Sequence, residues 1–121
     1  MTKIFLTTIP LRIQSEANLS EHRMKKHSRL KKQKGIIDLV LKNCGIKIPC
    51  RVVLTRVSPR ELDEHDNLRS AFKHVIDAIA NVLIPGLKPG RADGSKDIIW
   101  EFAQSKGLPK EYALRIHMEE L

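Results

Sequence analysis

Aromatic side chains, cysteines and long apolar runs are all scarce in this chain. Phe, Trp and Tyr together make 4% of its 121 residues, and there are two cysteines. Cys44 and Cys50 lack the spacing of a zinc site, and we assign them no chemistry. No apolar run approaches the roughly 20 residues that cross a bilayer, and the first ten residues do not resemble a signal peptide. We therefore expect a cytoplasmic protein without a membrane segment.

Acidic residues are scarce in the first half of the chain. The formal net charge of the whole chain is +8. Residues 1–60 hold 14 Lys and Arg against 3 Asp and Glu, whereas residues 61–121 hold 8 against 11. A strongly basic segment favours a polyanionic partner. We expect the first half to meet phosphates and the second half to hold cations.

The length suits one domain over residues 1–121, and no internal repeat is visible. The expected elements follow the order β-α-β-α-β-β. This order predicts an α+β domain with a small mixed or antiparallel sheet and two helices packed on it. The expected bounds are strands over 3–14 and 48–58, helices over 19–43 and from near Asp66 to Pro85, and a terminal β-hairpin formed by 97–105 and 111–118.

Proline, glycine and capping residues set the expected limits of the first two elements. Pro10 confines the first strand to a sheet edge or interrupts it. Asn18 and Glu21 have the spacing of a capping box for the first helix. Gly45 suits the C-terminal stop of that helix.

The second helix carries a continuous apolar stripe with a three- and four-residue spacing. The stripe comprises Leu68, Ala71, Phe72, Val75, Ile76, Ile79, Val82 and Leu83. Roughly opposite this stripe, Asp66, Ser70, Lys73 and Asp77 form a polar line. The sequence therefore predicts one buried face and one face that presents polar groups.

The first helix carries the main basic tract of the chain, with no acid between His22 and Ile37. Its cations are Arg23, Lys25, Lys26, Arg29, Lys31, Lys32 and Lys34. A solvated helix face is the plain alternative. We favour phosphate contact, because we expect no compensating acids at the three- or four-residue spacing of helical ion pairs. Since the tract has almost no aromatic residues, duplex or branched DNA fits better than stacked single strands.

Several acids lie where the second helix begins, in residues 63–66, which we call the acidic segment, and in the loop that follows this helix. Asp63 and Asp66 of the acidic segment are three residues apart. Asp93 or Asp97 from the Pro/Gly-rich loop would complete a set of oxygen ligands for Mg²⁺. Each acid also has a structural alternative. Asp63 or Asp66 suits a helix N-cap, and Asp93 with Gly94 suits a turn.

The acidic segment resembles the RusA-type Holliday junction resolvases and their phage relatives. The pattern is D-x-x-D-N-L over 63–68, then K-x-x-x-D-A-I over 73–79, then an acid seven residues before Trp100. The resemblance implies a homodimeric, Mg²⁺-dependent endonuclease, with Mn²⁺ as a possible substitute, that cuts four-way DNA junctions in recombination and repair. It also implies that Asp63, Asp66 and Asp93 bind metal and that Lys73 is catalytic. Further candidates are Glu64, Asn67 and Asp97.

Two alternatives from other classes stay open. One is a catalytically silent DNA- or RNA-binding module on the same scaffold, whose binding would be sensitive to salt and independent of divalent metal. The other is an interaction protein whose basic helix docks on an acidic partner, without preference for branched DNA.

Overall fold

A computed structural model describes residues 3–14, 23–62, 68–86 and 94–121 of the chain. Four strands and three helices lie in these residues, and they confirm the predicted α+β class. None of the described helices is both long enough and apolar enough to pass through a lipid bilayer. The elements are β1 (Ile4–Ile9), α1 (Arg23–Leu41), β2 (Cys50–Ser58), α2 (Arg69–Ala71), α3 (Lys73–Leu83), β3 (Ile98–Lys106) and β4 (Ala113–Glu120).

The four strands form one mixed sheet in the order β1-β4-β2-β3. β4 is antiparallel to both β1 and β2, whereas β3 is parallel to β2. The predicted hairpin between the last two strands is therefore wrong, because β2 separates them. A parallel β2–β3 pair requires a crossover, which the helical segment between these strands supplies.

The connection after β3 carries the chain past the end of β2. The Gly107 N–H donates to the Ser58 carbonyl over 2.9 Å, which ties this connection to the last residue of β2. β4 then pairs on both of its edges, and Leu114, Ile116 and Met118 become fully buried. This central position stabilises β4 more than an edge position in a hairpin would, since both rows of its backbone groups are hydrogen-bonded.

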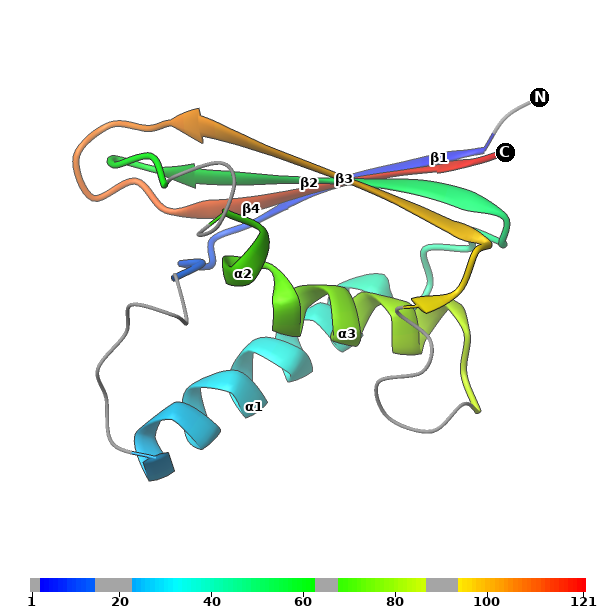
Figure 1. Cartoon of the computed structure of the whole chain (residues 1–121), viewed down its shortest axis with the longest axis horizontal. Helices are drawn as coiled ribbons and strands as arrows, with labels where there is room; N and C mark the ends of the chain where they lie inside the picture. Colours follow the sequence, from blue (N-terminus) through cyan, green and yellow to red (C-terminus); the bar gives the residue numbers. More distant parts are fainter. Residues whose placement is uncertain (1–2, 15–22, 63–67, 87–93) are drawn as a thin grey trace.

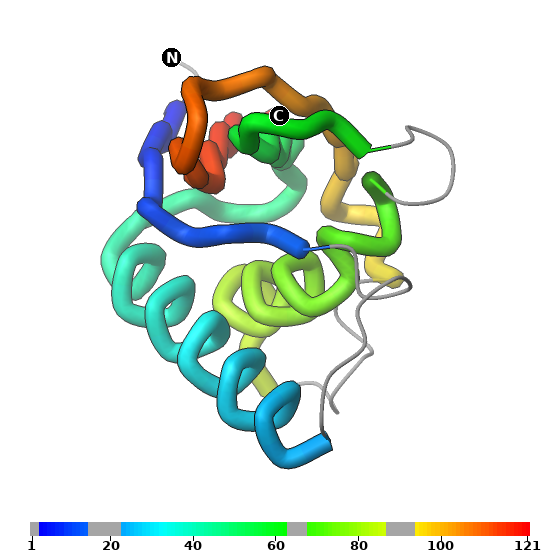
Figure 2. Tube along the Cα trace, turned by 90° about the vertical axis from the view of Figure 1, so that its left-hand side faces the viewer, coloured from blue at the N-terminus to red at the C-terminus, as the bar shows by residue number. Residues whose placement is uncertain are grey.

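Both long helices cover the same face of the sheet and lie side by side beneath it (Figures 1 and 2). The predicted apolar stripe is confirmed: Phe72, Val75 and Ile79 are fully buried. The single predicted helix is instead divided at Phe72, whose φ of −89° and ψ of −2° separate α2 from α3. The Phe72 ring stacks on Phe102 of β3, with ring centroids 5.5 Å apart.

Replacing Phe72 with leucine should lower the free energy of unfolding by about 1–2 kcal/mol, because the aromatic stacking and part of the packed volume are lost. Chemical denaturation monitored by circular dichroism would measure the change. Lys73→Leu is the matched control at the next, exposed position, where we expect a change within about 0.5 kcal/mol. Equal stability of Phe72→Leu and the wild type would contradict the assigned role of the ring pair.

The structure shortens the first predicted strand and agrees within two residues with the predicted end of the first helix. β1 is an edge strand that ends at Ile9, directly before Pro10, so the predicted strand over 3–14 is too long. α1 ends at Leu41, and Gly45 follows with a φ of +69°, which suits the predicted stop. The proposed capping box at Asn18 and Glu21 lies outside the described residues.

Candidate nucleic-acid interface

The basic tract lies on α1, which is held to the core by one narrow side. Gln33, Ile37 and Leu41 are the buried residues of this helix, and they recur every four positions. Most of its lysines are exposed. The helix therefore presents its cations along two flanks, and each flank borders a different part of the fold.

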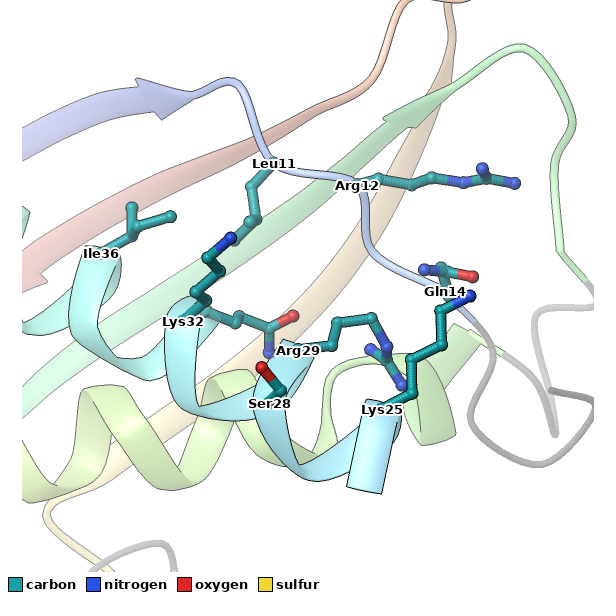
Figure 3. Close-up of a pocket in the computed structure, with 9 residues that line it drawn as sticks. Leu11, Arg12, Gln14, Lys25, Ser28, Arg29, Lys32 and Ile36 are labelled. Atoms are coloured by element: carbon teal, nitrogen blue, oxygen red, sulfur yellow. The ribbon is translucent and has the colours of Figure 1, made fainter. Parts of the chain in front are cut away.

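One flank of α1 forms a groove with the segment that follows β1. The cavity has a volume of about 540 Å³. Its α1 side contains Lys25, Arg29 and Lys32, and its other side contains Arg12. In Figure 3, Lys25 extends toward Gln14, and Lys32 extends toward Leu11. We call this cavity the basic groove; it is lined by Leu11, Arg12, Gln14, Lys25, Ser28, Arg29, Lys32, Gln33 and Ile36.

Arg56 of β2 holds the far wall of the basic groove in place. Its Nε donates to the Ile13 carbonyl over 2.8 Å, and its Nη1 donates to the Arg60 carbonyl over 2.7 Å. The residue is only 7% exposed, and this burial, with the charge of nearby Arg12, lowers the pKa of the guanidinium. Since Ile13 lies between Arg12 and Gln14, both groove residues are positioned by this clamp.

Arg12 itself lies against an aromatic ring. Its guanidinium carbon is 4.7 Å from the ring centroid of Tyr112, within the range of a cation–π contact. The contact restricts the side chain and leaves the guanidinium exposed to an incoming anion. The basic groove is thus lined by cations from segments more than ten residues apart in the chain, a common arrangement for binding a phosphate backbone.

Replacing Arg56 with methionine, which has a similar length but no donors, should lower the free energy of unfolding by about 2–3 kcal/mol. Two charge-assisted hydrogen bonds are lost, and two carbonyls lose their donors. Thermal denaturation would measure the loss. Arg60→Met is the control, because Arg60 contributes only its backbone carbonyl to the clamp; a similar loss in both variants would refute the role of the Arg56 guanidinium.

The other flank of α1 faces α3 across a smaller cavity of about 350 Å³. His27, Lys31 and Lys34 line it from α1, and His74 and Asp77 line it from α3. Asp77 was expected on an outward polar line. Asp77 is instead half-buried, as is the neighbouring His74, because α1 packs beside this part of α3.

One prediction about the basic tract is wrong. Lys34 forms an ion pair with Asp38, one helical turn later, over 3.4 Å. An acid therefore does compensate one cation at the four-residue spacing, although both side chains are exposed and the pair contributes little stability. Lys25 and Lys32 are exposed cations that line the basic groove.

The acids predicted to bind metal lie outside the described residues. These are Asp63, Glu64, Asp66 and Asp93, together with the neighbouring Asn67. Within residues 3–14, 23–62, 68–86 and 94–121, no three His, Cys, Asp or Glu side chains come together as a metal site.

The residues on both sides of the acidic segment are held firmly. Leu62 makes two hydrogen bonds to the side-chain amide of Gln104: its N–H donates to Oε1 over 2.8 Å, and its carbonyl accepts from Nε2 over 2.7 Å. Leu68 is 4% exposed and belongs to the core. Lys73 follows as the exposed first residue of α3. The structure therefore fixes the two residues that flank positions 63–67.

Asp97, a further candidate ligand, lies away from these anchors. It directly precedes Ile98, which pairs with Cys50 at the start of β2. Gln104, which holds Leu62, is six residues after Ile98 along β3, a distance of about 20 Å. The Asp97 N–H donates to Ser95 Oγ over 3.2 Å. The structure therefore does not bring Asp97 to Leu62.

Arg12, Arg56 and Gln104 were missed by the sequence reasoning. Arg12 lies in the segment assigned to the first strand, and Arg56 and Gln104 lie inside expected strands, so each had an ordinary interpretation. The only signal in the sequence was the position of Arg56. It falls on the same side of the alternating strand as Leu54 and Ser58, both of which are buried in the structure.

Comparison of the chain with protein-family models and with curated proteins gives no match in either set.

Proposed function

We propose that the protein binds the phosphate backbone of DNA through the basic groove and cleaves branched DNA with the acids of residues 63–93. The observation that carries the proposal is the convergence of Arg12 with Lys25 and Lys32 on one groove, from segments on opposite sides of residues 15–22. Contacts of this kind fix the position of a duplex without reading its sequence.

The cleavage part of the proposal rests on the acidic segment and on its resemblance to RusA-type resolvases. When held by Asp63, Asp66 and Asp93, Mg²⁺ would neutralise and polarise the scissile phosphate. Lys73 is an exposed residue at the start of α3, shortly after the buried Leu68. There its ammonium group would stabilise the charge that develops on the phosphate or the leaving oxygen.

The test is to incubate the purified protein with a labelled four-way junction, a linear duplex and a single strand, each with Mg²⁺, Mn²⁺ or EDTA. Binding and nicking are followed together. We expect paired nicks confined to the junction, and only with metal. Absence of nicks in both metals would refute the cleavage part, and equal affinity for all three DNAs would refute the preference for branches.

A catalytically silent nucleic-acid-binding module is the second candidate. One observation favours it: Arg12, Lys25 and Lys32 line one groove, and such cations can hold a phosphate backbone without a metal. This candidate predicts binding that is unchanged by EDTA and weakens steeply with salt, without cleavage under any condition.

A further inference from the structure

An uncharged ridge runs along the outermost side of α1. It consists of Met24, Ser28 and Gly35, whose spacing of four and seven residues keeps them on one side of the helix. Met24 is 68% exposed, and Ser28 and Gly35 are exposed as well. The buried Gln33 and Ile37 lie about 160° around the helix from Gly35. We call this side the outer ridge, and it points away from the core.

A row of lysines follows each side of the outer ridge. Lys25 and Lys32 lie about 60–80° from it on the side of the basic groove, which both residues line. Lys31 and Lys34 lie about 40–100° from it on the other side. All four are exposed. Lys34 also pairs with Asp38, but an exposed pair of this kind is weak. The outer ridge is therefore an uncharged strip between two rows of positive charge.

Gly35 lies inside α1 although the described part of the chain gives no packing reason for a glycine there. A Cβ atom at this position would meet no heavy atom of that part within 4 Å. The backbone is helical, a conformation that any L-residue adopts. Glycine is also among the poorest helix formers, so alanine would strengthen the helix. A missing side chain on an exposed ridge suits the close approach of a partner to the helix backbone.

The dimensions of α1 match the major groove of B-form DNA. A helix with its side chains is about 10–12 Å across, and this groove is about 12 Å wide and about 8.5 Å deep. A phosphate strand borders the groove on each side. A helix inside it therefore places an outward ridge on the base edges and its two flanks on the phosphates. The minor groove, about 6 Å wide, is too narrow for a helix.

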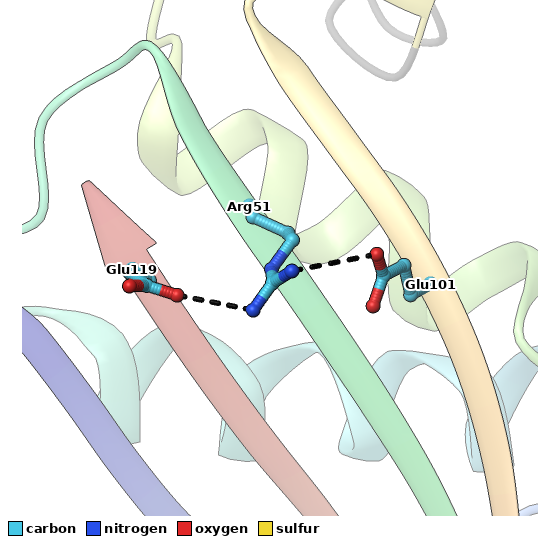
Figure 4. Close-up of polar contacts among 3 residues, drawn as sticks. All are labelled: Arg51, Glu101 and Glu119. Carbon is cyan, nitrogen blue, oxygen red and sulfur yellow. Dashed lines mark hydrogen bonds and ion pairs between the residues drawn. The ribbon is translucent and has the colours of Figure 1, made fainter. Parts of the chain in front are cut away.

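The first part of α1 lies at the lower edge of the described fold, on the side away from the sheet (Figures 1 and 2). The opposite face of the sheet is less suited to DNA. Arg51 forms ion pairs there with Glu119 over 3.1 Å and with Glu101 over 3.7 Å (Figure 4). Two carboxylates beside one guanidinium repel a phosphate backbone. The helix side is therefore the better surface for a duplex.

We propose that residues 24–35 of α1 lie in the major groove of duplex DNA, with the outer ridge against the base edges. Lys25 and Lys32 then contact the phosphates of one strand, and Lys31 and Lys34 contact those of the other. This inference rests on the proposed DNA binding, and it names the groove that is bound and the helix that enters it.

The outer ridge offers few base-specific contacts. The Ser28 hydroxyl both donates and accepts, so it suits either kind of base edge. Met24 offers an apolar side chain to a thymine methyl group, and Gly35 offers no side chain at all. We therefore expect major-groove contact with a weak sequence preference.

The proposal separates DNA from RNA as the partner. The major groove of A-form RNA is deep and narrow, so protein side chains cannot read its base edges. A helix that stays outside the groove contacts phosphates with one row of lysines at a time. We expect duplex RNA to bind about tenfold more weakly than duplex DNA of the same sequence at equal salt.

Fluorescence anisotropy in EDTA tests the proposal without cleavage. Three labelled DNA duplexes of one sequence are compared: plain DNA, DNA with glucosylated 5-hydroxymethylcytosine for cytosine, and DNA with inosine for guanosine. The sugars fill the major groove and leave the phosphates unchanged, whereas inosine removes an amino group from the minor groove. The glucosylated duplex should bind about tenfold more weakly than plain DNA, and the inosine duplex within about twofold of it.

Gly35→Leu tests the same contact from the protein side. Leucine on the outer ridge would hold the helix backbone away from the base edges, so the affinity for plain DNA should fall about tenfold. Gly35→Ala is the matched control, since it gives a similar gain in helix propensity with only a methyl group. Both variants should melt about 3–5 °C above the wild type, and Gly35→Ala should bind within about threefold of it.

Equal binding of the plain and glucosylated duplexes, or wild-type affinity of folded Gly35→Leu, would overturn the inference. Duplex RNA bound as tightly as duplex DNA would overturn it as well. Backbone binding through the basic groove would still stand after any of these results, since plain DNA is bound in each. A wild type that binds none of the duplexes would refute both this inference and the proposed function.

Discussion

Asp66→Asn should reduce junction cleavage by about 10²–10³-fold while leaving junction binding intact. The substitution keeps the size of the side chain and removes the charge that a divalent cation needs. The stabilisation that a metal gives to a phosphoryl transition state is worth several kcal/mol, and each 1.36 kcal/mol corresponds to a factor of ten in rate. Single-turnover nicking of a labelled junction measures the rate, and gel mobility in EDTA measures binding.

Glu61→Gln is the matched control for this experiment. Glu61 is an exposed acid just before Leu62, so the variant carries the same change in net charge near the same anchor. We expect its cleavage rate to equal that of the wild type. Full activity of Asp66→Asn would remove Asp66 from the proposed metal site. An equal loss in both variants would point to a general effect of charge.

Replacing Arg12, Lys25 and Lys32 together with glutamine should weaken DNA binding by about 10²-fold near physiological salt. Each phosphate contact releases about 0.9 counterion from the DNA on binding. Without three contacts, the plot of log affinity against log salt concentration should become shallower by about 2.7. Fluorescence anisotropy with a labelled junction at several salt concentrations measures both quantities.

The control for the groove variant removes three exposed lysines near the other end of the sheet. The backbone N–H of Lys47 donates to Glu120, which pairs with Cys50 at the start of β2. Arg56, the clamp of the basic groove, is six residues away along that strand, or about 20 Å. Glutamine at Lys42, Lys47 and Lys96 should change the affinity by less than about threefold. If both triple variants lose affinity equally, net charge rather than the basic groove determines binding.

The order of the elements could be predicted because each depends on local periodicity. The stripe from Leu68 to Leu83 repeats every three or four residues, and residues 48–58 alternate, so each segment has one solution that buries its apolar side chains. Gly45 and Pro10 act through their own backbone geometry. These features depend on neighbouring residues alone, and the structure confirms them, apart from the break at Phe72.

The pairing of the strands could not be predicted in the same way. The segments at 97–105 and 111–118 have a short connection between them, which is typical of a hairpin, yet β4 pairs with β1 and β2 instead. The choice depends on how many backbone groups the whole sheet satisfies, and that is a property of four strands together. The break of the second helix has a similar origin, because Phe72 turns toward Phe102 of a distant strand.

The basic tract and the acidic segment were visible in the amino-acid sequence, since charge and spacing are properties of consecutive residues. Which cations act together was decided by the tertiary structure. Arg56 joins β2 to the Ile13 carbonyl, and this long-range contact holds the segment of Arg12 against the groove that Lys25 and Lys32 also line. Among the described elements, both long helices pack on one face of the sheet, and this too is decided by tertiary structure (Figure 1). Local patterns determine which groups a segment offers, whereas long-range hydrogen bonds and burial decide which of them meet.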